Sequence, residues 1–223
     1  MSEELRNEEN TGQYVTGQMR EELAHRGVLM LDSVLEDDNG AWLMSKLLTL
    51  AADQPTRGIW LWINSPGGSV PAMLAIRDIM RSIPNRVSTL ALGMAASAGQ
   101  ILLSAGEPGH RYGLPHSKIL LHQGSSGIGG TAADVELAAG ELRDMRDTVL
   151  GLIAADTGQP VDRVFEDSLR DRWNNAEAAK DYGFIDHIVT NFHDISPSAA
   201  RQPVGLTSTI QPASSFSDER EQV

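Results

Sequence analysis

The sequence has no cysteine, so it can form no disulfide framework and offers no thiolate for catalysis or metal binding. It also lacks a surplus of positive charge: the formal net charge is −12, which argues against binding nucleic acid or anionic membranes. No apolar run approaches the roughly 20 residues that a membrane-spanning helix needs, and the acidic, polar start is unlike a signal peptide. These absences lead us to expect a cytoplasmic protein.

The chain does have enough apolar residues for one domain, because 41% of its 223 residues are hydrophobic. Its two ends differ from its middle in composition. The start is polar and acidic, and the end is rich in Ser and Pro, so both bury too little apolar surface to offset the entropy of ordering. We therefore expect a flexible segment at 1–20, one domain at 21–193 and a disordered tail at 194–223.

The middle of the chain alternates between strand and helix patterns. Strands are expected at 58–63, 86–94, 118–123 and 184–189. Helices are expected after the cap residue Ser69, at 96–105, and at 176–182 between the cap residue Asn175 and the stop residue Gly183. Strands that alternate with helices indicate an α/β fold with a largely parallel sheet.

One further helix carries a narrow apolar seam with alternating spacings of three and four residues. The seam consists of Val135, Ala138, Leu142, Met145, Val149 and Leu152. The plainer interpretation is an amphipathic helix that packs on its own core. The alternative is a helix that projects to meet a partner, with the glycine-rich stretch 124–130 beside it as a loop or flexible strand.

A serine, a histidine and an aspartate together supply the parts of acyl-transfer chemistry. Ser97 stands where an expected strand ends and a helix begins, near unpaired N–H groups and the positive end of the helix dipole. His122 ends another apolar strand, and Asp171 lies between Arg170 and Arg172. Each residue also has a plainer interpretation: a helix cap, a structural histidine and a surface ion pair, respectively.

Other patterns for functional sites are missing or weak. The histidines have no zinc-ligand spacing and there is no His-Glu-x-x-His motif, so we expect no metal. Gly67-Gly68 lacks the Lys-Ser/Thr of a phosphate loop, and could form a simple turn after a strand. Ala95 stands where the nucleophile elbow Gly-x-Ser-x-Gly has its first glycine.

Five segments match the motifs of one family in order and in spacing. They are 64–68 (Asn-Ser-Pro-Gly-Gly), 93–97 (Gly-Met-Ala-Ala-Ser), 121–123 (Leu-His-Gln), 170–173 (Arg-Asp-Arg-Trp) and 176–186. With these residues the chain resembles the ClpP family, the proteolytic subunits of the ATP-dependent Clp protease. The resemblance covers roughly residues 25 to 190.

The resemblance implies a serine endopeptidase that works through an acyl-enzyme and needs no cofactor. Ser97 would be its nucleophile, His122 its general base and Asp171 the residue that orients the base. The N–H groups of Gly68 and Ala98 would form the oxyanion hole. The fold implied is the crotonase-like α/β fold of ClpP, with a projecting handle helix.

The same resemblance implies an assembly and partners. Two heptameric rings, of one kind of subunit or of two paralogues, would form a tetradecamer that encloses a chamber for unfolded polypeptides and short peptides. An AAA+ unfoldase ATPase would feed the chamber. The residues implied are Val135, Leu142, Met145 and Val149 for the handle, Gly127, Ile128 and Gly129 for the substrate-aligning strand, and Trp60 and Trp62 for the ATPase-docking cleft.

Several positions depart from the family pattern and indicate a divergent paralogue. Ala98 replaces the usual methionine, Gly124 the usual proline, Leu169 an acidic residue, and Trp60 and Trp62 the common tyrosines. Two other functions remain as alternatives. The chain could be a structural or regulatory subunit that is active only with a paralogous ring, or, more remotely, a crotonase-type acyl-CoA enzyme.

Overall fold

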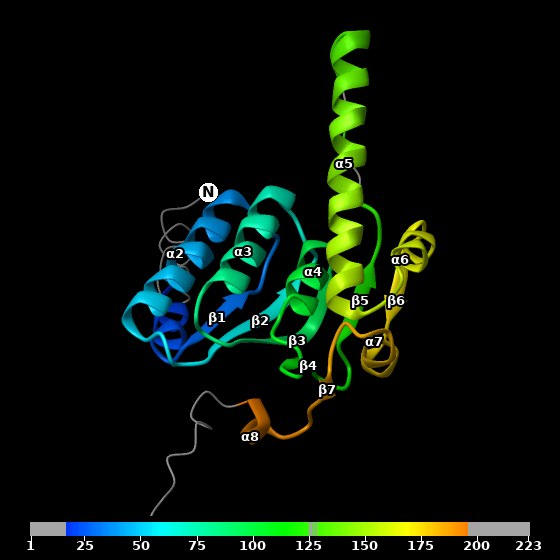
Figure 1. The fold of residues 1–223 in the computed structure, drawn as a ribbon. Helices are drawn as coiled ribbons and strands as arrows, with labels where there is room; N and C mark the ends of the chain where they lie inside the picture. Colours follow the sequence, from blue (N-terminus) through cyan, green and yellow to red (C-terminus); the bar gives the residue numbers. More distant parts are fainter. Residues whose placement is uncertain (1–16, 125–126, 128, 196–223) are drawn as a thin grey trace, which may run out of the picture.

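The computed structural model describes residues 17–124, 127 and 129–195, and in this part of the chain seven strands form one mixed sheet (Figure 1). The strands are β1 (Val28–Leu31), β2 (Ile59–Ser65), β3 (Val87–Ala96), β4 (Arg111–Gly113), β5 (Lys118–Leu121), β6 (Arg172–Asn174) and β7 (His187–Ile188). The order β1-β2-β3-β4-β7 is parallel throughout. The long strand β3 pairs with β4 through 89–91 and with β5 through 94–96, and β6 joins β5 antiparallel.

Most of the helices cover one face of this sheet, and the last short helix packs on the other face. The helices are α2 (Asp37–Asp53), α3 (Val70–Ser82), α4 (Ala98–Ser104), α5 (Ala132–Thr157), α6 (Val161–Ser168), α7 (Ala176–Tyr182) and α8 (Phe192–Ile195). Figure 1 shows α2, α3 and α4 side by side across the strands, with α5 next to α4. None of the helices in the described ranges is both long and apolar enough to cross a membrane.

The main core lies between the strands and these helices. Its fully buried side chains come from both layers and include Leu29, Leu47, Leu61, Met73 and Leu102. Each such side chain contributes about 1.5–3 kcal/mol relative to an exposed one. This packing fixes the positions of the strand ends, from which the loops of the site extend.

Strand β2 separates two apolar layers, because its side chains alternate between the faces of the sheet. Ile59, Leu61 and Ile63 are at most 1% exposed and belong to the main core. Trp60 and Trp62 point to the other face and are half-buried. The second cluster on that face also contains Leu90, Leu92, Tyr112, Leu114, Val189 and Ile195. The strand expected at 58–63 is therefore present as β2, with apolar side chains on both of its faces.

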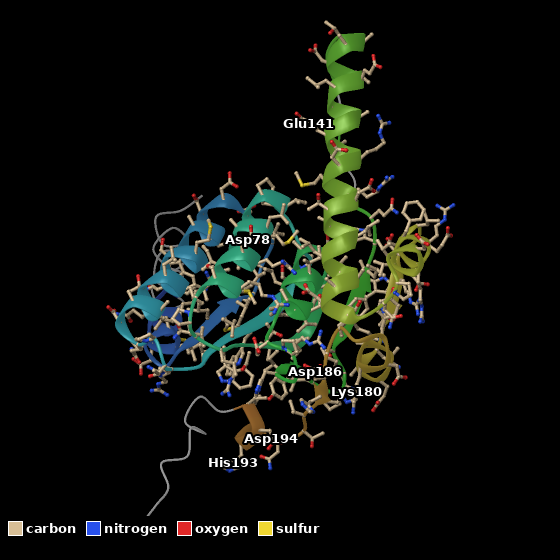
Figure 2. The ribbon with its side chains drawn as sticks, viewed as in Figure 1. Asp78, Glu141, Lys180, Asp186, His193 and Asp194 are labelled. Carbon is tan, nitrogen blue, oxygen red and sulfur yellow. The ribbon has the colours of Figure 1, made fainter. Side chains whose placement is uncertain are left out.

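Helix α5 has a base that packs on the body and a tip that does not. In the base, residues 148–157, Leu150 and Ile153 are buried and Asp156 pairs with Arg77 and Arg81. The tip, residues 132–147, has no buried residue. Figure 2 shows Glu141 on this tip, where the side chains spread outward clear of the other elements.

Several local predictions are confirmed. The Ser69 hydroxyl accepts a hydrogen bond from Ala72 N at 3.3 Å and caps α3. The Asn175 side chain accepts one from Ala178 N at 2.9 Å and caps α7, and Gly183 ends α7 with a left-handed φ of +95°. These signals worked because caps and left-handed stops depend on neighbours in the sequence.

Other boundaries differ from the predictions. The strand expected at 184–189 is limited to β7, because Phe184 N donates to Ala179 O at 2.9 Å and closes the end of α7 instead. Residues 17–20, which were assigned to the flexible N-terminal segment, are helical, so the ordered part reaches at least to residue 17. Asp194 and Ile195, assigned to the tail, belong to α8. Strands β1, β4 and β6 and helices α2 and α6 were not predicted.

Candidate active site

The carboxyl ends of three neighbouring parallel strands bring the predicted motifs together. Strand β2 runs into the Gly67-Gly68 turn, β3 runs into Ser97, and β5 runs into His122. The register pairs Ala96 with Leu120, and Ser97 N donates to Leu120 O at 3.3 Å. Loops at the carboxyl ends of parallel strands are the usual place for ligands in α/β folds.

Ser97 has an unusual backbone. Its φ is +54°, and among the described residues it is the one non-glycine residue with a positive φ. Such a conformation costs on the order of 1–3 kcal/mol and is often found at functional sites. Ser97 is the N-cap residue of α4, yet its hydroxyl accepts no capping hydrogen bond within the described residues. The hydroxyl is therefore not used as a helix cap, and this removes the plainer interpretation of this serine.

The glycine turn lies directly against Ser97. A Cβ at Gly67 would lie 2.6 Å from Ser97 Cβ and 3.1 Å from Ala98 N, and φ at this position is +104°. At Gly68, where φ is +143°, a Cβ would overlap the carbonyl oxygen of Leu35. Neither position can hold a side chain, because one would meet Ser97 and the other the backbone of Leu35.

Two backbone amides next to Ser97 are free to bind an oxyanion. Leu35 N donates to Gly67 O at 2.7 Å and Ser69 N donates to Leu35 O at 2.8 Å, which leaves Gly68 N between them without a backbone acceptor in the described chain. Ala98 N opens α4, and the first N–H groups of a helix have no partner inside it. A Cβ at Gly67 would lie 3.1 Å from Ala98 N, so the glycine turn and the start of α4 are packed closely together beside Ser97.

The register of β5 and β6 brings His122 and Asp171 together. Leu121 pairs with Arg172 in this antiparallel ladder, so the residue after β5 faces the residue before β6. His122 Nδ1 lies 3.6 Å from Asp171 Oδ1, and the Asp171 side chain is 67% exposed. This distance exceeds that of a hydrogen bond, and in sites without substrate such catalytic contacts are often long.

The second ring nitrogen of the histidine faces away from this carboxylate. His122 Nε2 is buried and has no hydrogen-bond partner among the described residues. A histidine that served only a structural role would be expected to have its buried nitrogen bonded. An unbonded nitrogen close to the Ser97 strand end can instead accept a proton.

Two supporting residues were not assigned a role from the sequence. The Ser65 hydroxyl, in a fully buried residue, accepts a hydrogen bond from Gly67 N at 3.1 Å and holds the glycine turn. Asn64 Oδ1 accepts one from Met94 N at 3.1 Å and ties β2 to β3 just before Ser97. A serine two residues before a turn glycine is a recognisable sequence signal, whereas the Asn64 contact depends on the sheet register.

The glycine-rich stretch has a limited description. Gly127 and Gly129 are exposed and belong to no strand, and Ile128 lies outside the described residues. The substrate-aligning role therefore stays a prediction. The chain also shows no group of three or more His, Asp or Glu residues that could hold a metal within the described ranges.

The residues expected to form the handle lie along α5. Val135, Leu142 and Met145 are 40%, 38% and 37% exposed on the tip of α5, and Val149 packs against the main core. Their oligomer role stays a prediction.

Trp60 packs against Tyr112 with the rings tilted by 38° and their centroids 5.3 Å apart. Trp62 Nε1 is buried with no acceptor in the part of the chain that is described. This face carries an apolar surface that Ile195 of α8 partly covers. Its docking role also stays a prediction.

Comparisons with known proteins agree with the family motifs around Gly67, Ser97, His122 and Asp171. The family model described as Clp protease matches residues 10–192. The chain is 51% identical over 167 residues to the ATP-dependent Clp protease proteolytic subunit 1 of Frankia casuarinae, which covers 75% of this chain and 78% of that one. It is 45% identical over 188 residues to subunit 3 of Streptomyces coelicolor, with 84% and 87% covered, and 46% identical over 175 residues to subunit 2 of Corynebacterium efficiens, with 78% and 88% covered. The chain therefore belongs to the Clp protease family.

Proposed function

We propose that this peptidase is a serine endopeptidase in which Ser97, His122 and Asp171 act as one catalytic unit. The observation that carries the proposal is the strained backbone of Ser97, whose hydroxyl is left free at the start of α4 beside two available amides. A strained turn from strand to helix presents a serine nucleophile in other hydrolases as well. Relatives named as proteolytic subunits support the same activity.

The reaction follows from these positions. Ser97 Oγ attacks the carbonyl carbon of the scissile peptide bond, and His122 Nε2 takes the hydroxyl proton. The negative oxygen that forms is bound by Gly68 N–H and Ala98 N–H. His122 then gives its proton to the leaving amine, and the acyl-enzyme remains. Water, deprotonated by His122, releases the acyl group and restores the hydroxyl of Ser97.

In the single chain, His122 Nε2 has no hydrogen-bond partner among the described residues and His122 Nδ1 lies 3.6 Å from Asp171 Oδ1. These long contacts fit a site that is completed when the protein assembles or binds substrate.

We propose a ring assembly, with unfolded polypeptides and short peptides as substrates. The exposed apolar residues on the tip of α5 support a contact between rings, because soluble helices rarely leave such a seam uncovered. Gly127 to Gly129 would pair with the substrate backbone.

We also propose that an ATPase of the AAA+ class docks on the face that carries Trp60 and Trp62. Half-buried tryptophans are common anchors in protein interfaces, because they combine a large apolar surface with one donor. The free Trp62 Nε1 supports this, since a buried donor gains by meeting an acceptor from a partner.

The test of the catalytic unit uses the assembled protein. Ser97→Ala should lower peptide hydrolysis by about a thousandfold or more, and His122→Ala and the double variant should be about equally inactive, because the two residues act together. A fluorophosphonate probe should label the wild type and not Ser97→Ala. Ser97→Ala that keeps near-normal hydrolysis would overturn the assignment.

A matched measurement separates this peptidase from a subunit that needs a paralogous ring. The wild type is assayed alone and after mixing with a paralogue whose own serine has been replaced by alanine. Hydrolysis by the chain alone identifies a self-sufficient peptidase. Hydrolysis that occurs only in the mixture identifies a chain whose triad needs the second ring.

A further inference from the structure

The last turn of α6 contacts the chain beside His122. Gln123, the next residue, donates from its backbone N to Ser168 O at 3.0 Å and from Nε2 to Ser168 Oγ at 3.1 Å. Ser168 is 1% exposed, and its hydroxyl donates to Phe165 O at 2.7 Å. Two hydrogen bonds therefore join the residue pair after β5 to the end of α6, and a third, within α6, fixes the Ser168 hydroxyl that takes part in one of them.

The same turn also contacts the chain beside Asp171. Asp167, which precedes Ser168, forms an ion pair with Arg172, the residue that follows Asp171. The Arg172 guanidinium lies over the Tyr182 ring, 4.9 Å from its centroid, and Arg163 lies over this ring at 5.3 Å. Arg172 is thus held both by a carboxylate and by an aromatic face.

Asp171 itself has little else to hold it. Its side chain is mostly exposed, and within the described residues the one basic side chain within 4.0 Å of its carboxylate is His122. Strand β6 is three residues long and pairs with β5 alone. The position of its carboxylate therefore depends on the neighbouring backbone, and Arg172 is the nearest anchored point.

We infer that Asp167 and Ser168 are positioning residues: the last turn of α6 holds Gln123 and Arg172 together and so sets the distance between His122 and Asp171. The inference rests on the proposed function. The turn is suited to this task because Val164, one helical turn earlier, is fully buried in the main core. One rigid turn thereby holds the neighbours of both residues, although 48 residues separate them in the sequence.

The test compares variants in the assembled protein. Asp167→Asn keeps the shape of the side chain and removes its charge. It should lower kcat by about 10- to 100-fold with KM within about twofold, because only orientation in the reacting state is lost. Asp167→Glu should recover most of the rate. The control is Arg81→Gln, which removes one of the two arginines that pair with buried Asp156 at the base of α5. This variant should lower the stability of the protein without lowering kcat.

A double-variant cycle asks whether Asp167 acts through Asp171. In an Asp171→Asn background, Asp167→Asn should change the rate of fluorophosphonate labelling by less than about twofold, because the residue to be positioned is already disabled. A loss of the same size in both backgrounds would show a general structural effect and overturn the inference. If Asp167→Asn does not assemble, Ser168→Ala, which deletes one oxygen, decides by the same cycle.

The outcomes also separate this inference from the proposed function. If Ser97→Ala stays active, the triad assignment fails and the inference falls with it. If Ser97→Ala is inactive while Asp167→Asn and Ser168→Ala both retain full kcat, the triad stands and the positioning role alone is wrong.

Discussion

The proposed catalytic corner and the tip of α5 are built in opposite ways. At the corner, formed by Gly67, Gly68, Ser97, His122 and Asp171, backbone segments pack so closely that two positions accept no side chain, and one residue is held in a strained conformation. At the tip, an ordinary helix with a capping box at its start presents exposed apolar side chains to solvent. Strain and close packing mark one region, and uncovered apolar surface marks the other.

The difference predicts how each region should respond to substitution. The geometry of the corner is fixed by close contacts within its own chain, so small changes in side-chain size there should lower the rate of peptide hydrolysis. The tip has few contacts within the chain, so changes there should affect assembly and leave the fold intact. The same kind of substitution should therefore have opposite results in the two regions.

Among substitutions that leave Ser97, His122 and Asp171 in place, Gly67→Ala should have the largest effect on activity. The added methyl group meets Ser97 Cβ and Ala98 N, and the positive φ is strained for alanine. We expect kcat/KM to fall by about 100-fold or more, because a displacement of the nucleophile of about 1 Å can cost that much. Steady-state peptide hydrolysis by the purified assembly checks this. Full activity would mean that the turn adapts without moving Ser97.

Gly140→Ala makes the same substitution in the tip of α5. A Cβ at Gly140 meets nothing within 4 Å, and alanine is the better helix former by about 1 kcal/mol. Activity and assembly should stay unchanged while the unfolding temperature rises slightly, as followed by circular dichroism. A loss of activity as large as that of Gly67→Ala would contradict the contrast between the two regions.

Leu142→Asp tests the tip as a contact surface. A carboxylate in a covered apolar seam is costly, so the assembly should break into single rings or smaller species while each subunit keeps its helicity. Sedimentation velocity gives the mass. Leu137→Asp is the matched control: Leu137 is 68% exposed and lies off the seam, so it should leave the assembly intact. Unchanged mass for Leu142→Asp would show that the seam faces solvent.

The sheet face that carries Trp60 and Trp62 lies between these two cases, because both side chains are half-buried: part of each packs in the second cluster and part stays exposed. Trp62→Ala should weaken ATPase docking by about tenfold or more, as loss of a central aromatic anchor commonly does, yet spare hydrolysis of very short peptides. Trp62→Tyr should strengthen binding of small activators made for a tyrosine-lined cleft. Calorimetry on intact assemblies measures both, and equal activator affinity for wild type and Trp62→Tyr would contradict the role of Trp62.

An effect on stability alone is expected at the base of α5, where Arg111 joins Asp186 to the backbone of α5 by donating to Asp156 O at 2.6 Å. Burial by itself raises the pKa of Asp186, but the hydrogen bonds and charge of Arg111 outweigh burial and hold this pKa below its ordinary value. Ionised Asp186 therefore stabilises the fold at neutral pH, and this stability is lost as the pH falls through the lowered pKa.

Asp186→Asn should accordingly be less stable than the wild type at pH 7 and should lose less stability between pH 7 and strongly acid pH. Urea unfolding at several pH values measures this. Glu141→Gln, on the tip of α5 (Figure 2), removes one carboxylate elsewhere and controls for net charge. If the free energy of unfolding falls equally with pH in the wild type and in Asp186→Asn, the pair of Asp186 with Arg111 does not contribute to the pH dependence of stability.

The sequence predicts local features well and long-range ones only in part. The caps Ser69 and Asn175 and the stop at Gly183 follow from adjacent residues, and the alternation along β2 follows from its period of two. Strands β4, β6 and β7 are short, and pairing with distant strands, not their own composition, defines them. Such pairing is not visible in a local pattern.

The site shows the same division. Ser97 and the glycine turn could be identified as unusual from their small neighbours and position between elements. The contact of His122 with Asp171 could not be derived from spacing alone, because it depends on the antiparallel register of β5 and β6. The contact of Ser65 with the glycine turn and the proposed role of Asp167 also stayed hidden, since a buried serine and a charged residue near a helix end are common in any sequence.

The antiparallel pair of β5 and β6 has a consequence for how this chain can evolve. All of α5 and α6 is inserted between the two strands, and it leaves the sheet beside His122 and returns beside Asp171. The strand register and the last turn of α6 fix both ends of this inserted segment. Whole helical turns can therefore be added to or removed from the tip of α5 without changing the distance between His122 and Asp171. Lineages can thus vary the proposed contact surface on the tip of α5 while they keep the spacing between His122 and Asp171.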